Sequence, residues 1–145
     1  MARLESNESR YLVSDEMIET LVNAAIAAAK HAYIPYSHYP VGAALLAADG
    51  TIYGGCNVEN AAFPATICAE RTALVKAVSE GKRGFLAIAV VTRDGGSPCG
   101  TCRQMLHEFA PDLRVIVADL NGQVKYEMSM DEMLPHGFTQ GSLKA

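Results

Sequence analysis

Residues 66–73, with the sequence TICAERTA, bring three reactive side chains together at the predicted start of a helix. Cys68, Glu70 and Arg71 fall within four consecutive positions. A thiolate can bind a soft metal ion, and a carboxylate two residues away can take up and deliver protons. The guanidinium and the positive end of the helix can offset the charge of the thiolate. The segment therefore predicts a metal site that also moves protons.

A second motif, SPCGTCRQ at residues 97–104, supplies the other candidate ligands. Cys99 and Cys102 have C-x-x-C spacing, which places both thiols on one face of a helix. With Cys68 they make three sulfur ligands, and zinc with three protein ligands and an open fourth position is typical of a catalytic site. Zinc lowers the pKa of a bound water from about 16 to about 7, and Glu70 is placed to take its proton. We therefore expect one Zn²⁺ per chain.

Charge and composition restrict the class of protein. The chain has 145 residues, enough for one domain with its own core, and 50% of them are hydrophobic. A net charge of −4, without a Lys/Arg run, argues against binding to a nucleic acid polymer. No segment approaches the roughly 20 apolar residues of a membrane span, and the N-terminus lacks an apolar signal core. We expect a cytoplasmic protein with reduced thiols and no membrane partner.

Hydrophobic periodicity predicts the elements that position the two motifs. Helices are expected at 14–33, at 66–81, after the turn at 95–98, and briefly from Ser129, whose spacing to Glu132 resembles a capping box. Strands are expected at 85–92 and 113–120, which are apolar enough for the middle of a sheet, and at 123–130. Residues 41–58 should form a hairpin. The expected caps and turns are Ser14, Thr66, Asp49-Gly50, Gly81 and Asn121-Gly122.

The order α-β-β-α-β-α-β-β predicts an α/β fold, a three-layer αβα sandwich with a five-stranded mixed sheet. Residues 14–145 are expected to form a single catalytic domain, residues 1–13 a flexible N-terminal arm, and residues 135–145 an irregular tail. The alanine-rich second half of the first helix should let another backbone approach closely, in this chain or in a neighbour.

Four motifs, in this order, resemble the small homotetrameric cytidine deaminases whose zinc ligands are all cysteine: PYSHYPVGAAL, GCNVENAAF, CAERTA and PCGTCRQ. The resemblance extends from about residue 14 to residue 138. It implies a cytidine deaminase-like fold and hydrolytic deamination of cytidine and deoxycytidine to uridine and deoxyuridine, with release of ammonia, in pyrimidine salvage. Glu70 would pass protons to N3 and to the leaving amine, while Arg71 balances charge at zinc. Homotetramers of the family share active sites between subunits.

The resemblance also implies the substrate contacts. Asn57 and Glu59 would bind the ribose, and the backbone of Ala69 and the carbonyl of Ser97 would contact the base. The resemblance also includes three aromatic residues. Two of them differ from the residue that is usual in the family, and the third lies in the C-terminal tail. Tyr39 stands where the family often has phenylalanine in contact with the nucleoside, Phe63 stands where tyrosine is frequent, and Phe138 would stack on the pyrimidine of another subunit.

Other interpretations remain open. Three cysteines could belong to a structural zinc site in a non-enzymatic scaffold, with Cys56 or a histidine as fourth ligand, although Glu70 and Pro98 favour catalysis. Cys56 is expected to be a buried strand residue, and Glu108 a solvated one. A deaminase of RNA or DNA bases would need a basic channel, and a deaminase of nucleoside antibiotics on the same scaffold is harder to separate. The histidines expected on the surface or in packing are His31, His38, His107 and His136.

Overall fold

The computed structural model describes residues 13–144 and is built on a five-stranded sheet with strand order β2-β1-β3-β4-β5. Strands β3 and β4 are parallel, and the other neighbouring pairs are antiparallel. This arrangement confirms the predicted mixed sheet. The strand bounds are β1 Gly42–Ala47, β2 Ile52–Cys56, β3 Phe85–Thr92, β4 Arg114–Asp119 and β5 Val124–Ser129.

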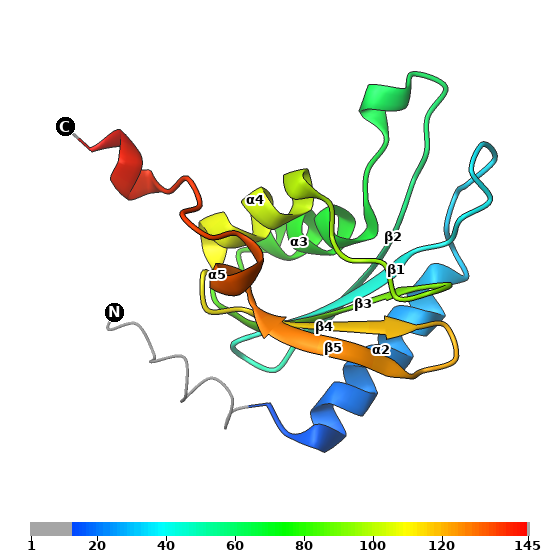
Figure 1. Ribbon diagram of the computed structural model, residues 1–145, viewed down its shortest axis with the longest axis horizontal. Helices are drawn as coiled ribbons and strands as arrows, with labels where there is room; N and C mark the ends of the chain where they lie inside the picture. The colour runs from blue at the N-terminus through cyan, green and yellow to red at the C-terminus, as the bar shows by residue number, and fades with distance from the viewer. Residues whose placement is uncertain (1–12, 145) are drawn as a thin grey trace.

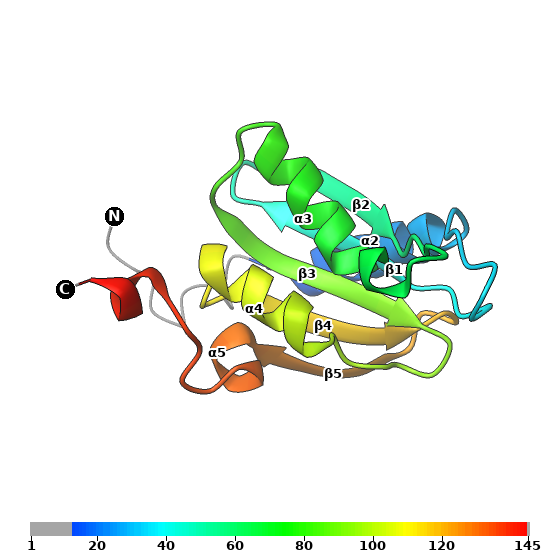
Figure 2. The same ribbon diagram turned by 90° about the horizontal axis from the view of Figure 1, so that it is seen from above.

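Helices cover both faces of the sheet, so the predicted three-layer αβα sandwich is confirmed (Figures 1 and 2). Helix α2 (Asp15–Ala29) packs on one face, and α3 (Ala69–Ser79) and α4 (Gly100–Phe109) lie side by side on the other. The short α5 (Met130–Met133) follows β5 and packs against α4. Two 3₁₀ helices, η1 (Phe63–Ala65) and η2 (Gln140–Leu143), complete the elements, and η2 occupies part of the tail predicted to be irregular.

The central strands carry the core. Every residue of β1 is buried, and β3 and β4 are buried almost throughout, because helices cover them on both sides. Two hydrophobic clusters result, one beneath α3 and α4 and one beneath α2. Full burial of one aliphatic side chain contributes roughly 1.5–3 kcal/mol, so these clusters provide the rigid base on which the helices sit. Edge strand β5 is mostly exposed or half-buried.

Local signals set several boundaries as expected. Ser14 caps α2, since its Oγ accepts a hydrogen bond from the amide of Met17 at 3.1 Å. Gly50 and Gly122 turn the two hairpins with positive φ, and Gly81 with φ 93° follows the end of α3. Ser129 caps α5, since its Oγ accepts from the amide of Glu132 at 3.3 Å.

The predicted cap at Thr66 is wrong, and the reason lies in Ile67. The amide and the carbonyl of Ile67 both bond to Val58, each at 2.9 Å, in an isolated antiparallel bridge. A residue held in this way is extended, and Cys68 after it is extended too, with φ −72° and ψ 154°, so α3 begins at Ala69. Cys68 becomes the N-cap residue instead, but its side chain makes no capping hydrogen bond. The sulfur therefore stays available for other partners.

The predicted boundary between the N-terminal arm (1–13) and the domain lies at the edge of the described residues. Val13, which the sequence placed in a flexible arm, is buried, and its carbonyl accepts a hydrogen bond from Arg114 at 3.1 Å. The rest of the predicted arm, residues 1–12, lies outside the described part of the chain. Over residues 13–144, no helix combines the length and the apolar character that a membrane crossing requires.

Glycine allows the helices on both faces to approach the sheet closely. A Cβ built on Gly42 of β1 would lie 1.9 Å from the carbonyl oxygen of Ala25 in α2. The alanine-rich half of α2 thus packs within its own chain. On the opposite face, a Cβ on Gly55 of β2 would lie 2.5 Å from the carbonyl oxygen of Ala69 and 2.6 Å from the amide of Ala73. Both contacts are to helix backbone, which cannot move aside as a flexible side chain can.

We predict that Gly55→Ala destabilises the fold because the added methyl group pushes α3 away from β2. Overpacking of this kind typically lowers the free energy of unfolding by about 1–3 kcal/mol. Gly54→Ala is the matched control, since its Cβ would meet only the side chain of Ala28 at 3.6 Å, an ordinary contact. Denaturant unfolding of both variants measures the difference. Equal stability of the two variants would contradict the close approach at Gly55.

Candidate active site

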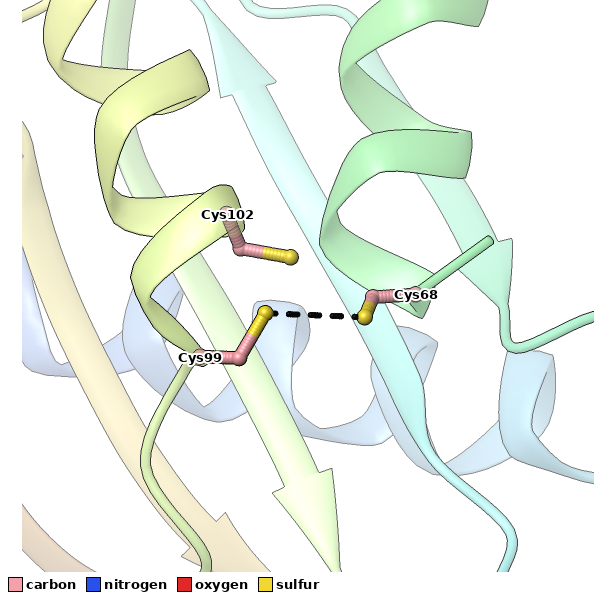
Figure 3. Close-up of side chains that lie close together, drawn as sticks. All are labelled: Cys68, Cys99 and Cys102. Atoms are coloured by element: carbon pink, nitrogen blue, oxygen red, sulfur yellow. Dashed lines mark hydrogen bonds between the residues drawn. The ribbon is translucent and has the colours of Figure 1, made fainter. Parts of the chain in front are cut away.

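Three cysteine sulfurs converge where α3 and α4 begin. Cys68 is the N-cap residue of α3, Cys99 is the N-cap residue of α4, and Cys102 lies in the first turn of α4. All three Sγ atoms lie within 4.8 Å of one another, and those of Cys68 and Cys99 are 3.7 Å apart. Figure 3 shows the three side chains pointing toward a common centre from the two helix starts. The two sequence motifs are therefore brought together in space.

The spacing of the sulfurs fits zinc. Two thiolates bound to one tetrahedral zinc at about 2.3 Å lie about 3.8 Å apart, close to the 3.7 Å between Cys68 and Cys99. All three cysteines are free of disulfides. Within residues 13–144, no further histidine, cysteine or carboxylate joins the group, and Cys56 stands half-buried at the end of β2 rather than fully buried as expected. The geometry thus leaves a fourth position open.

Arg71 holds the thiolate of Cys68 in place. Its Nη2 donates to the carbonyl of Thr66 at 3.1 Å and to the Sγ of Cys68 at 3.5 Å. Hydrogen bonding from Cys102, and then from Arg71, lowers the pKa of Cys68 to about 5. The same contact with Cys68, together with burial, raises the pKa of Cys102. Between Cys68 and Cys102, Cys68 therefore carries negative charge more readily, and the guanidinium of Arg71 faces it.

Glu70 is a buried carboxyl group in the first turn of α3. It is only 3% exposed, and burial raises its pKa because the charged form loses hydration. It lines the same pocket as Cys68 and Cys99. A carboxyl group whose pKa is raised holds a proton more readily than an exposed one, so it can donate as well as accept. The site therefore combines three cysteines that can bind a metal with a carboxyl group that can transfer protons.

The pocket beside these groups has a volume of about 210 Å³ and is open on one side. Of the residues predicted to bind substrate, Tyr39, Asn57, Ala69 and Ser97 line it. The residues of the wall that the sequence did not assign to the site are Val41, Thr66, Val90, Thr92 and Gly96. Thr92 could have been suspected, since a polar residue at the carboxyl end of a buried strand often faces a ligand site.

Glu59 and Phe63 line a neighbouring pocket of about 410 Å³, together with Tyr36 and Ser37. Thr66 belongs to both linings, so the two pockets adjoin. The Oε1 atom of Glu59 accepts from the amides of Tyr36 and Ser37 at 3.0 and 3.1 Å, and hydrogen bonding with Ser37 lowers the pKa of Glu59. Glu59 therefore stays ionised beside the second pocket.

Asn57 and Arg103 fix the walls of the first pocket. The side-chain amide of Asn57 donates to the carbonyl of Tyr39 and accepts from the amide of Val41, both at 2.9 Å. Arg103 donates to Ser97 Oγ at 3.0 Å and to the carbonyl of Pro98 at 2.8 Å. The sequence motif contains Arg103, but its spacing alone gave no sign that it binds the segment leading to Cys99.

Phe138 lies apart from both pockets. Its side chain is 56% exposed, and its carbonyl accepts from Gln104 of α4 at 2.9 Å. It lies two residues after His136, which has a φ of 56°. Within one chain, the structure therefore does not bring Phe138 to the site. Of the four histidines, His107 is buried and the other three are not, and the exposed Glu108 accepts a hydrogen bond from Gln140 at 3.0 Å.

Comparison with known proteins gives one consistent result. Residues 15–118 match the family model described as cytidine and deoxycytidylate deaminase zinc-binding region. The cytidine deaminase of Sporosarcina psychrophila is 49% identical over 129 residues, which cover 87% of this chain and 94% of the relative. The crystal structure of cytidine deaminase from Burkholderia pseudomallei has a TM-score of 0.78 and 46% identity, and the match covers 82% of this chain and 97% of the other.

We predict one equivalent of zinc per chain, held by Cys68, Cys99 and Cys102. Because each sulfur is one of only three protein ligands, Cys99→Ala should lower the zinc content to well below half an equivalent. Cys56→Ser is the matched control, since Cys56 lies outside the cluster. Elemental analysis of the purified proteins measures the metal. Zinc content that stays undiminished in Cys99→Ala would contradict the assignment of ligands.

Proposed function

Because this chain belongs to the cytidine and deoxycytidylate deaminase family, we propose that it deaminates cytidine and deoxycytidine by hydrolysis. The products are uridine or deoxyuridine and ammonia, so the protein is a hydrolase with zinc as its cofactor. The observation that carries this proposal is the meeting, at one pocket, of three cysteine sulfurs and the buried carboxyl group of Glu70. A non-enzymatic zinc scaffold gives no reason for an acid–base group beside an open metal position.

Zinc supplies a Lewis-acidic centre that makes water reactive at neutral pH. Cys68, Cys99 and Cys102 would hold the metal, and Arg71, which donates to the sulfur of Cys68, would balance part of the thiolate charge. The oxygen of water bonds to C4 of the base, while Glu70 takes one proton of that water and delivers it to N3. Glu70 then takes the second proton, from the hydroxyl group on C4, and delivers it to the amine. The C4–N bond breaks as the C4 carbonyl forms, and the nitrogen leaves as ammonia. The raised pKa of Glu70 suits a group that must both accept and release a proton.

The rest of the pocket binds the nucleoside. The backbone of Ala69 and the carbonyl of Ser97 contact the base, and the ring of Tyr39 packs against the substrate. Asn57 and Glu59 bind the sugar, which extends from the first pocket into the second past Thr66. Phe63 and Tyr36 form an edge-to-face pair at the outer wall, with ring centroids 5.6 Å apart.

The family includes deaminases of a nucleoside and of a nucleotide, and charge favours the nucleoside here. The residues that line the two pockets include no lysine or arginine, while Glu59 contributes a carboxylate. A phosphorylated substrate would meet repulsion rather than a cationic partner. A deaminase of nucleoside antibiotics remains the second candidate, and replacing cytidine by such a compound in the assay separates the two.

We further propose a homotetramer with shared active sites, a cytoplasmic location and a role in pyrimidine salvage. The exposed ring of Phe138 supports shared sites, because it is tied through its backbone to α4 and does not reach the pocket of its own chain. The free cysteines support a reducing compartment, since a zinc-binding thiolate cluster must escape oxidation.

The reaction is tested by the fall in cytidine absorbance after addition of the purified protein, with and without a zinc chelator. We expect deamination that the chelator abolishes. Unchanged cytidine in the presence of zinc-loaded, folded protein would refute the proposed function.

We predict that Glu70→Gln retains the fold and the zinc but loses turnover. Glutamine has nearly the same shape, yet it cannot pass a proton between water and base. General acid–base groups typically contribute about 10²–10⁴-fold, and a residue that acts in several steps should reach the upper end or exceed it. Glu108→Gln, an exposed change on α4, is the matched control. A kcat of Glu70→Gln near that of the unaltered protein would exclude Glu70 as the proton carrier.

We predict that Phe138 completes the site of a neighbouring subunit. Glu70→Ala and Phe138→Ala chains are co-expressed with different affinity tags, and mixed assemblies are purified through both tags. If Phe138 acts in trans, some mixed sites combine an intact Glu70 with an intact Phe138, and activity exceeds that of either parent. If it acts in its own chain, no such site can form, and activity only averages the two parents.

A further inference from the structure

The hydroxyl group of Tyr39 joins two loops that border the pocket. Tyr39 lies in the loop at 36–41, is half-buried and lines the 210 Å³ pocket. Its hydroxyl donates to Oδ1 of Asp94 at 2.7 Å, across 55 residues of sequence. Asp94 belongs to the turn at 93–97, which follows β3 and leads to Cys99. The β1–β3 pairing ends at Gly42 and Val91, and the two loops continue from these strand ends. Beyond the last paired residues, side chains join them.

Arg93 strengthens the same connection. Its guanidinium carbon lies 5.5 Å from the centre of the Tyr39 ring, within the range of a cation–π contact. Its Nη2 also donates to the carbonyl of His38 at 3.0 Å. The turn at 93–97 thus contacts the ring face and the hydroxyl group of Tyr39 and the carbonyl of His38. Of these contacts, only the hydroxyl bond depends on tyrosine rather than on another aromatic residue.

The contacts continue inward from both ends of the link. Thr92 donates to Oδ1 of Asp94 at 3.4 Å, and its Oγ1 accepts from the amide of Gly96 at 2.6 Å. The residue after Gly96 is Ser97, which lines the pocket. On the other side, Asn57 bonds to the carbonyl of Tyr39. A chain of hydrogen bonds therefore runs from the sugar side of the pocket, through Tyr39 and Asp94, to the base side.

The backbone before Tyr39 shows why a link is needed. His38 has a φ of 55°, a left-handed conformation that is strained for a residue other than glycine. Such a conformation persists where surrounding contacts fix it. Released from Asp94 and Arg93, the loop could relax at His38 and carry the Tyr39 ring away from the pocket.

We propose that the hydrogen bond between Tyr39 and Asp94 is a latch that sets the width of the nucleoside pocket. Tyr39 acts here as a positioning residue through its hydroxyl, in addition to the contact of its ring with substrate, and the inference rests on the proposed deaminase function. The latch touches neither Glu70 nor the three cysteine ligands. It therefore governs substrate affinity rather than the chemical step.

Tyr39→Phe tests the latch because it removes the hydroxyl and keeps the ring. We expect KM for cytidine to rise about two- to tenfold, the range that the loss of one hydrogen bond supplies, with kcat within about twofold of its original value. Asp94→Ala should raise KM similarly, and the double variant should be no worse than the poorer single variant. Tyr126→Phe, on strand β5, is the matched control and should leave both constants unchanged, because Tyr126 lines neither pocket.

Hydrogen exchange gives a measurement that does not depend on activity. In Tyr39→Phe, amide exchange should accelerate together in residues 36–41 and 93–97, while α3 and α4 keep their protection. Unchanged KM, a loss confined to kcat, additive effects in the double variant, or unaltered exchange in both loops would each overturn the latch. If the unaltered protein fails to deaminate cytidine, the proposed function falls, but the exchange data still decide whether the two loops are linked.

Discussion

The site depends on one constraint: its three cysteine sulfurs lie within 4.8 Å of one another, and as thiolates they would repel one another. Three thiolates so close together cannot all be ionised unless cations compensate them. The protein offers Arg71 beside Cys68 and the positive ends of α3 and α4, where all three cysteines lie. A divalent cation supplies the remaining charge. Zinc therefore belongs to the electrostatic balance of the site as well as to its chemistry.

The fold serves this constraint by bringing two helix starts to one place. The parallel pair β3 and β4 requires a crossover, and α4 provides it on the same face of the sheet as α3. Gly55 lets α3 settle directly onto β2, and the bridge between Val58 and Ile67 delays the start of α3 until Ala69. Had the helix begun at Thr66, Cys68 would lie inside its first turn, facing in another direction. The β-bridge between Val58 and Ile67 thus determines the direction in which the side chain of Cys68 points.

Features that depend on neighbouring residues in the sequence were predictable, and features that depend on contacts between residues far apart in the sequence were not. The strand at 85–92, the glycine turns and the cysteine motifs depend on nearby residues, and the structure has them where expected. The start of α3 was misplaced because Thr66 is a good cap in isolation, while the bridge that overrides it involves Val58. Likewise, no spacing rule reveals that Arg103 binds the carbonyl of Pro98 or that Tyr39 reaches Asp94. The residue roles inferred from family resemblance remain predictions.

The site divides into a rigid part and an adjustable part. The cysteines and Glu70 lie at helix starts packed on a buried sheet, so their geometry follows from the core. Tyr39, Glu59 and Phe138 lie in loops or in the tail, where a few hydrogen bonds fix each position. Reactions need atoms placed to within a fraction of an ångström, whereas recognition of a sugar tolerates more variation. Under the proposed substrate contacts, changes in the loops should therefore alter substrate choice while the cysteine cluster and Glu70 keep their geometry.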